Sequence, residues 1–305
     1  MSALFPHGSG RQALISRLEW WLEQCAFGLL LMIVGWLPWI FSQTQLDTVE
    51  LPKQTVLIVS AGLVWFLLVL QDALRGAWHI VWDRSAKILA TTLLVLALGA
   101  ILSRDPYGSW VGMTKQIPTA MLSLIGVFAW WLAIRRLVQS PLRFAMVIGI
   151  WLVSAGVLAW GTVAWLLGAT MWPWSLEIFR VITPAGAVSE VAVFLLLPTL
   201  LAAAFVIHGG KILALTKRTV VHVLRGLGAV VLIPSFFLIG LVGSVGLWLA
   251  LALAALVFAV VVTAKRARQS WLVLAAICFV SAVTIFAPAI NPWQKLATRV
   301  SITVS

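Results

Sequence analysis

The sequence predicts an all-α, polytopic membrane protein, a bundle of about nine transmembrane helices with its N-terminus inside and its C-terminus outside. Two observations carry this prediction. Of the 305 residues, 62% are hydrophobic and only 10% are charged, whereas about a quarter of the residues of a soluble domain are charged. Uncharged runs near 20 residues also recur along the chain, and that length is what a helix needs to cross a bilayer.

Nine stretches are candidate spans, the shorter ones with help from flanking polar residues. They are Cys25–Phe41, Thr55–Leu70, Ile88–Ser103, Ile117–Ile134, Phe144–Leu167, Val188–Ile207, Val220–Ile239, Gly246–Thr263 and Trp271–Pro288. The uncharged run Gly226–Thr263 would measure about 57 Å as one helix, against a hydrocarbon core of about 30 Å. Two spans that turn near Gly240, Gly243 and Gly246 are therefore favoured over one long span.

Lysine and arginine orient the chain. With the N-terminus inside, 15 of the 21 basic residues fall on the cytoplasmic face and 6 fall outside, as the positive-inside rule requires. Residues 1–24 are then a cytoplasmic segment with an interfacial helix at Leu14–Glu23. Residues 25–288 form the transmembrane domain, and 289–305 form an extracytoplasmic tail. This arrangement is that of a multi-pass membrane protein, with membrane lipid as a partner.

Several function classes find no support. The net charge of +12 lies mostly in short loops between spans, where it signals topology, so we expect no nucleic-acid partner. Cys25 and Cys278 sit in apolar runs without ligand spacing, and we expect no metal and no cofactor. No span carries a charge near its middle, which disfavours a proton-coupled transporter.

The candidate binding residues lie in two outward loops. The loop Ser103–Gln116 carries Arg104, Lys115 and the only tyrosine, Tyr107, and the loop Gly168–Glu190 carries Arg180. Basic residues kept on a face that is otherwise poor in them could bind phosphate or pyrophosphate. The alternative is an ordinary interfacial loop, with aromatic anchors and with cations that are solvated or paired with Asp105 and Glu177.

Two motifs resemble the bacterial O-antigen ligases and polymerases. The first is Leu51-Pro52-Lys53-Gln54 at the start of a span. The second is Ser103-Arg104-Asp105-Pro106-Tyr107-Gly108-Ser109-Trp110-Val111-Gly112, which is similar to the Ser-x-x-Pro-Tyr-x-Ser-x-x-Gly loop of that family. The stretch Arg180 to Pro198 is similar to a later loop, although only Pro184-Ala185-Gly186 echoes its Gly-x-Pro-Asn element.

The resemblance implies metal-independent glycan transfer from an undecaprenyl-pyrophosphate carrier on the outer face, with an arginine on the pyrophosphate. Two departures stand out: the turn Gly243-Ser244-Val245-Gly246 lacks the family's basic residue, and the chain stops where a catalytic loop would begin, near Asn291-Pro292-Trp293. We therefore expect a truncated chain that is inactive alone, since its four histidines are cytoplasmic. The alternatives are a transporter or flippase of a lipid-linked anion, and a non-catalytic membrane subunit whose protein partners are unknown.

Overall fold

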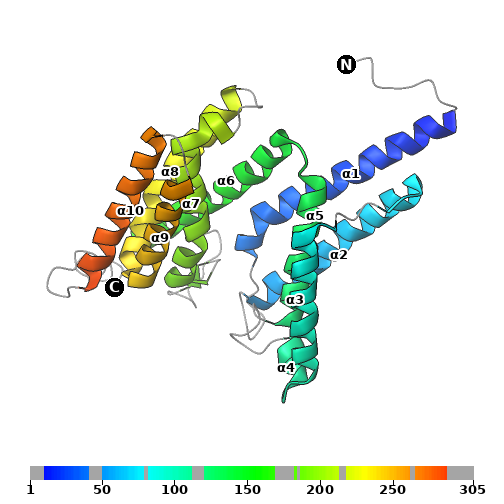
Figure 1. Cartoon of the computed structure of the whole chain (residues 1–305), viewed down its shortest axis with the longest axis horizontal. Helices are drawn as coiled ribbons and strands as arrows, with labels where there is room; N and C mark the ends of the chain where they lie inside the picture. Colours follow the sequence, from blue (N-terminus) through cyan, green and yellow to red (C-terminus); the bar gives the residue numbers. More distant parts are fainter. Residues whose placement is uncertain are drawn as a thin grey trace. The chain divides into compact units, whose positions relative to one another are not determined.

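The computed structural model in Figure 1 is helical and describes residues 10–40, 50–78, 82–111, 120–168, 182–183, 186–212, 218–261 and 265–286. The chain forms two compact units, Met1–Phe144 and Ala145–Ser305. Within the described residues, six helices are long and apolar enough to cross a membrane, namely α1, α2, α3, α6, α7 and α8. The prediction of a helical, multi-pass membrane protein is confirmed at this level. The number of nine spans and the orientation of the termini stay predictions.

Unit 1 contains five α-helices and one 3₁₀ turn. They are α1 (Gly10–Trp36), η1 (Leu37–Trp39), α2 (Glu50–Arg75), α3 (Arg84–Ile101), α4 (Pro106–Val111) and α5 (Met121–Leu137). The expected interfacial helix Leu14–Glu23 is continuous with the first span, because no proline lies between Gly10 and Trp36 and a helix propagates until something breaks it.

Two tryptophans join α2 to α5. The indole of Trp65 donates to the carbonyl oxygen of Ala129 (2.9 Å), and the indole of Trp130 donates to that of Leu57 (3.0 Å). At Gly126 an added Cβ would lie 2.8 Å from a methyl group of Leu57. Glycine thus allows a close helix approach, and the indole bonds fasten it, which is how helices associate where lipid surrounds them.

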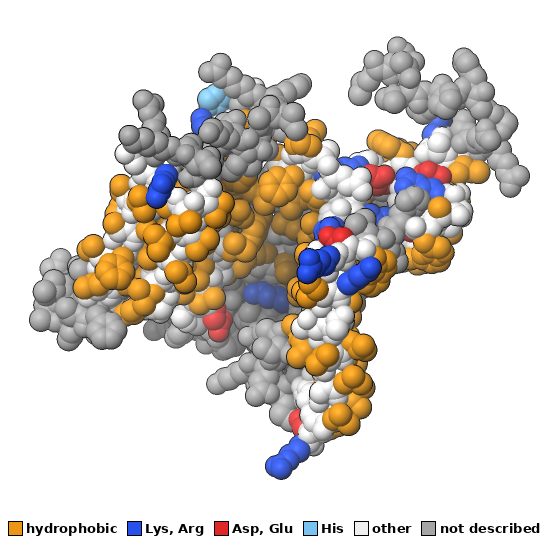
Figure 2. Space-filling model, in the orientation of Figure 1, with side chains coloured by type: hydrophobic (Ala, Val, Ile, Leu, Met, Phe, Trp, Pro, Cys, Tyr) orange, Lys and Arg blue, Asp and Glu red, His pale blue; other side chains and the backbone are white. Residues whose placement is uncertain are grey.

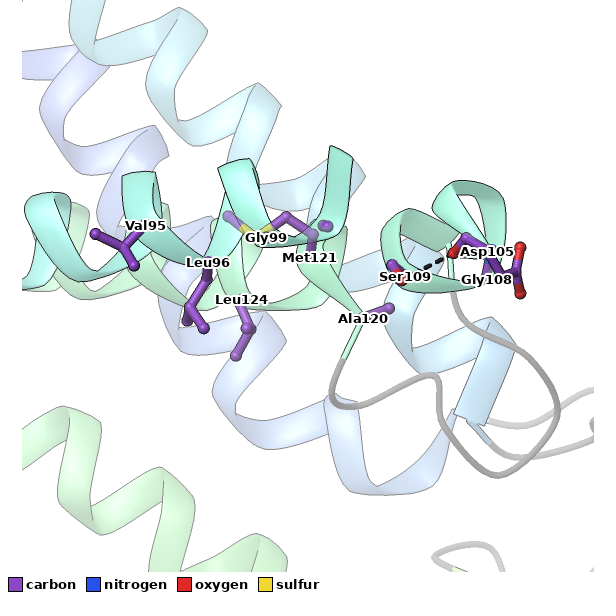
Figure 3. Close-up of a pocket in the computed structure, with 10 residues that line it drawn as sticks. Val95, Leu96, Gly99, Asp105, Gly108, Ser109, Ala120, Met121 and Leu124 are labelled. Carbon is purple, nitrogen blue, oxygen red and sulfur yellow. Dashed lines mark hydrogen bonds between the residues drawn. The ribbon is translucent and has the colours of Figure 1, made fainter. Parts of the chain in front are cut away.

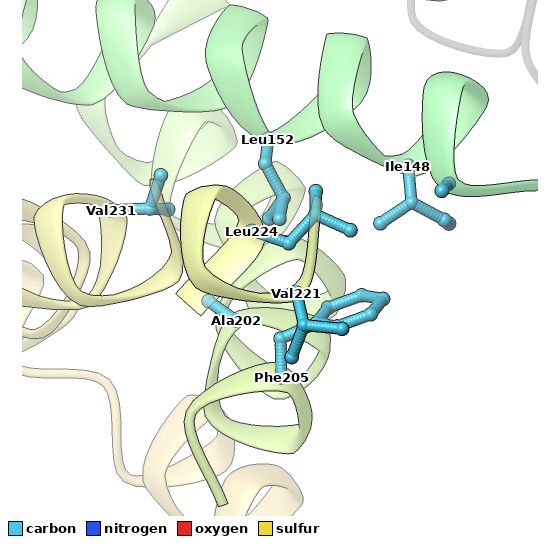
Figure 4. Close-up of a cluster of buried hydrophobic side chains, with 8 residues drawn as sticks. Ile148, Leu152, Ala202, Phe205, Val221, Leu224 and Val231 are labelled. Atoms are coloured by element: carbon cyan, nitrogen blue, oxygen red, sulfur yellow. The ribbon is translucent and has the colours of Figure 1, made fainter. Parts of the chain in front are cut away.

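Unit 2 is built from the remaining five helices and one short ladder. They are α6 (Pro141–Leu166), which starts at the end of unit 1, β1 (Ile182–Thr183), β2 (Gly186–Ala187), α7 (Val188–Ile212), α8 (Arg218–Val242), α9 (Val245–Val261) and α10 (Lys265–Phe286). In Figure 4, Ile148 and Leu152 of α6 point toward Leu224 of α8, and Phe205 of α7 lies against Val221. This cluster forms one core of unit 2.

The long uncharged run Gly226–Thr263 is divided, as the length argument predicts. Helix α8 ends at Val242 and α9 starts at Val245. Between them, Gly243 adopts φ +62° and donates to the carbonyl of Gly240 (3.0 Å). A left-handed residue after a helix is a common stop, and only glycine adopts it without steric strain. The predicted break in this run is confirmed, and a crossing of the membrane by α9 stays a prediction.

A proline inside α8 leaves a carbonyl that a neighbouring helix satisfies. Pro234 has no N–H, so the carbonyl of Val230, four residues earlier, loses its helical donor. The indole of Trp160 on α6 donates to this oxygen at 3.2 Å. Trp160 is 44% exposed, and no water competes for a carbonyl at such a site within a bilayer.

Apolar side chains make up much of the surface of each unit on the face that Figure 2 shows in orange. On α3, for example, Leu94 and Val95 are each 62% exposed. Apolar surface of this extent is unusual on a soluble monomer and is normal where lipid is the solvent.

Candidate functional site

The Pro-Tyr motif folds as a capped one-turn helix, α4, directly after α3. The Asp105 carboxylate accepts a hydrogen bond from the N–H of Gly108 (3.0 Å), which is the geometry of a helix N-cap. Pro106 occupies the first helical position, where a missing N–H has no consequence. An added Cβ at Gly108 would lie only 2.1 Å from the second carboxylate oxygen. The local structure therefore explains why Asp105, Pro106 and Gly108 occupy these positions of the motif.

Serine hydroxyls extend the cap. The hydroxyl of Ser109 donates to the backbone carbonyl of Asp105 (2.8 Å), and the hydroxyls of Ser103 and Ser109 lie 2.8 Å apart. The two serines of the motif, six residues apart, thus tie the end of α3 to α4. Asp105 keeps acceptor capacity beyond its bond to Gly108, since a carboxylate has about four acceptor sites.

The two motifs that suggest the family resemblance contact one another. The side-chain amide of Gln54, 8% exposed near the start of α2, donates to the carbonyl of Val111 at the end of α4 (3.3 Å). This bond joins Leu51-Pro52-Lys53-Gln54 to the Pro-Tyr loop. A buried amide needs such a partner, so Gln54 fixes where α4 sits on α2.

An open groove of about 680 Å³ lies between α3 and α5 and ends at α4. Val95, Leu96, Gly99 and Ala100 of α3 line it, as do Ala120, Met121 and Leu124 at the start of α5. Asp105, Gly108 and Ser109 of α4 form its polar end. Figure 3 shows the apolar side chains along the helices and the α4 residues beyond them at one end. The groove therefore has apolar walls and one hydrogen-bonding end.

The structure describes two of the four predicted site residues. Arg104 and Tyr107 are exposed at the junction of α3 and α4, with Tyr107 72% exposed. Lys115 and Arg180 lie outside the described residues, so the predicted anion site of Arg104, Lys115 and Arg180 stays a prediction. The predicted tail 289–305 lies outside them too.

A second polar centre, which the sequence reading missed, lies at one end of unit 1. The guanidinium of Arg136 on α5 donates two hydrogen bonds to the carboxylate of Asp72 on α2, at 2.8 and 2.6 Å. Their side chains are only 8% and 2% exposed. Arg136 also donates to the side-chain oxygen of Gln71 (3.1 Å). A buried charge pair needs this full hydrogen bonding to offset its desolvation.

More ion pairs surround this centre. Arg143 contacts Glu23 at 2.5 Å, and Arg75 contacts Glu19 at 3.0 Å. Among the described residues, these ion pairs join four arginines and four carboxylates, whose formal charges cancel: Arg75, Arg135, Arg136, Arg143, Glu19, Glu23, Asp72 and Asp83. Blue and red side chains lie next to one another over α1, α2 and α5 in Figure 2. Four of the basic residues that the topology argument uses are thus paired with carboxylates.

Asp83 at the start of α3 belongs to this centre. Arg135 donates to both of its carboxylate oxygens (2.6 and 2.7 Å), and the N–H of Ala86 donates to one of them (2.9 Å). The hydrogen bonds from Arg135 and then from Ala86 hold the pKa of Asp83 well below its ordinary value, and Asp83 in turn raises the pKa of Arg135. Both groups stay charged at any physiological pH.

These arrangements limit the chemistry available. In the part of the chain that the structure describes, no group of three or more His, Cys, Asp and Glu side chains could hold a metal ion. The polar end of the α3–α5 groove offers the carboxylate of Asp105 and the hydroxyl of Ser109, and Arg104 precedes Asp105 in the sequence. Such groups bind hydroxyl-bearing and anionic ligands.

The sequence contains some indication of the Asp72–Arg136 pair and none of the contact between Gln54 and Val111. Gln54 belongs to the motif Leu51-Pro52-Lys53-Gln54, but its partner Val111 lies 57 positions away. A local sequence pattern does not reveal a contact between residues so far apart. Asp72 and Arg136 each end an apolar helix, and a carboxylate and a guanidinium at matching helix ends could have suggested a pair.

Comparisons with family models, curated proteins and solved structures gave no match for this chain.

Proposed function

We propose that this chain is an O-antigen ligase-like protein of the bacterial inner membrane that acts in surface-polysaccharide assembly. In this proposal it binds an undecaprenyl-pyrophosphate-linked glycan on the outer face and takes part in transferring or polymerising that glycan. One observation carries the proposal: the groove between α3 and α5 has apolar walls and ends at the polar turn Ser103–Ser109.

The groove matches the three chemical parts of such a ligand. A polyisoprenoid tail would cover Val95, Leu96 and Leu124, which removes apolar surface from contact with water or with disordered lipid. The pyrophosphate would lie beside Arg104, whose guanidinium can bind two phosphate oxygens at once. Sugar hydroxyls would donate to Asp105 and exchange hydrogen bonds with Ser109.

The polar end of the groove is organised before any ligand binds. The cap on α4, the serine pair and the bond from Gln54 hold this end in place. A site held by such contacts loses little conformational entropy on binding. This organisation supports a binding role for the motif over a role as a plain connecting loop.

A direct test measures carrier binding by the full chain in lipid nanodiscs. Arg104→Ala should weaken binding of undecaprenyl pyrophosphate roughly 10- to 150-fold, since a charge-assisted contact contributes about 1.5–3 kcal/mol. Arg180→Ala should have an effect of the same order if both arginines hold the pyrophosphate. Unchanged binding in both variants would contradict the proposed anion site.

A second pair of variants tests the groove itself. Leu96→Trp places a large ring in the groove and should reduce carrier binding. Leu98→Trp, at a position 52% exposed and outside the groove lining, is the matched control for Leu96, which is 47% exposed. Equal binding by the two variants would argue against the groove.

Carrier movement across the bilayer without glycan transfer would favour the transporter or flippase alternative.

A further inference from the structure

Unit 1 and the C-terminal part of unit 2 differ in the number of carboxylates that accompany their basic residues. Unit 1 pairs four arginines with four carboxylates. From Val191 to Ser305, by contrast, the sequence contains nine lysines and arginines and no aspartate or glutamate. The cations of this stretch therefore have no carboxylate within the stretch to pair with.

In the sequence, seven of these cations fall at or beside three helix ends of unit 2, and the structure describes the side chains of two of them, Arg225 and Arg268. The seven flank the end of α7, the start of α8 and the start of α10: Lys211, Lys217, Arg218, Arg225, Lys265, Arg266 and Arg268. Arg268 is exposed. The buried Nε of Arg225 has no hydrogen-bond partner among the described residues. Clusters of four to eight basic residues beside membrane helices attract anionic lipids, each contributing about 1 kcal/mol.

An apolar groove of about 640 Å³ starts at this basic end. Val206 and Ile207 of α7, Leu232 and Phe236 of α8, and Val273 and Ile277 of α10 line its length. Among the described residues, the polar ones that line it are Gln269 and Ser270, near the basic start of α10. Arg225 lies two helical turns before Leu232 on the same face of α8, toward the basic end.

The length of the groove fits one leaflet. From Gln269 to Ile277 the helix rises about 12 Å, and half of the hydrocarbon core is about 15 Å. The first N–H groups of α10 add a partial positive charge at the same end. Apolar walls along the depth of a leaflet, with cations at the surface end, are complementary to an acyl chain below a phosphate.

We infer that this α7–α8–α10 groove binds an anionic phospholipid, with one acyl chain against Val273 and Ile277 and the phosphate held by Arg225 and Arg268. The phosphate supplies a negative charge of the kind that the stretch from Val191 to Ser305 lacks. The site lies in the other unit from the α3–α5 groove, so the inference holds or fails independently of the proposed function.

The test uses the full chain in nanodiscs that contain phosphatidylglycerol and phosphatidylcholine, with retained lipid measured by native mass spectrometry. The unmodified protein should retain phosphatidylglycerol preferentially. Arg225→Gln and Arg268→Gln should each lower that preference about fivefold, the equivalent of about 1 kcal/mol. Lys87→Gln, which removes an exposed charge from unit 1, should leave it unchanged.

The groove has its own matched pair of variants. Val273 and Val280 lie on α10 and are each 59% exposed, and only Val273 lines the groove. Val273→Trp should expel the retained lipid, and Val280→Trp should keep it. Equal retention of the two lipid classes, or equal loss in the two tryptophan variants, would overturn the inference. Displacement of phosphatidylglycerol by stoichiometric undecaprenyl phosphate would also overturn it, because the occupant would then be the carrier.

Discussion

Arg136 holds Asp72 through two hydrogen bonds of 2.8 and 2.6 Å, and this pair links the last turn of α5 to the last turn of α2. Both side chains are almost completely buried. The pair is the centre of the polar cluster at one end of unit 1.

Removal of one partner should strongly destabilise unit 1. Asp72→Asn leaves the Arg136 guanidinium buried without its counter-charge, and such a change costs about 3–5 kcal/mol. The double variant Asp72→Leu with Arg136→Met removes both charges and should be much closer to the unmodified protein. Thermal unfolding in detergent, followed by far-ultraviolet circular dichroism, measures both. Additive effects in the double variant would contradict the pairing.

The indole of Trp160 should matter because of Pro234. Trp160→Phe keeps most of the apolar ring and removes the donor to Val230, so it should destabilise the protein by about 1–3 kcal/mol. Pro234→Ala restores the helical N–H for the same carbonyl. Trp160→Phe should therefore have little effect in a Pro234→Ala background. An undiminished effect there would show that the indole acts only by packing.

Substitution of glycine by alanine should have opposite effects on stability at two positions of α8. An added Cβ at Gly228 would lie 2.9 Å from the backbone oxygen of Ala202 on α7, whereas one at Gly226 meets nothing within 4 Å. Gly228→Ala should push α7 and α8 apart and cost about 1–3 kcal/mol. Gly226→Ala should stabilise by about 0.5–1 kcal/mol, as in other helix interiors. The difference in unfolding midpoint between the two variants is the measurement.

The charge on Asp83 should have a defined pH dependence. Its pKa is lower in the folded protein than in the unfolded chain, where it is about 3.9. The stabilisation is therefore complete above the unfolded pKa and is lost as the pH falls toward the folded pKa. Asp83→Asn keeps an acceptor for Ala86 and removes the charge.

The difference in unfolding midpoint between the unmodified protein and Asp83→Asn should thus be constant from pH 5 to 8. It should shrink below about pH 4. A difference that grows on acidification, or that changes between pH 6 and 8, would contradict the role of this ion pair.

The helical class and much of the helix pattern followed from the sequence, because hydropathy acts locally. Uncharged runs placed α6, α7 and α8 close to their observed bounds, and Gly243 marked the turn between α8 and α9. The Pro-Tyr motif predicted a turn after α3, where a turn of helix capped by Asp105 was found.

Contacts between distant residues did not follow from the sequence, because they depend on tertiary packing. The bond from Gln54 to Val111 and the pair of Asp72 with Arg136 join residues 57 and 64 positions apart. The helix expected at Leu14–Glu23 is the first part of α1. The ion pairs of its Glu19 with Arg75 and its Glu23 with Arg143 are likewise contacts between distant residues that the sequence does not show.

The topology is open to a direct chemical test. In a background without native thiols, Tyr107→Cys should react in intact cells with a reagent that does not cross membranes. Gln139→Cys, exposed in the turn between α5 and α6, should react only after the membrane is opened. The reason is the excess of basic residues on the Gln139 side. Reaction of Gln139→Cys in intact cells would invert the predicted orientation.

The most direct test of the proposed function maps where a lipid-linked pyrophosphate touches the protein. A photoreactive polyisoprenyl pyrophosphate, added to the full chain in nanodiscs and located by peptide mass spectrometry, should label the segments Val95–Ala100 and Met121–Leu124. Unlabelled undecaprenyl pyrophosphate should compete, and Leu96→Trp should abolish the label. Labelling confined to unit 2, or labelling of unit 1 without competition, would contradict the account.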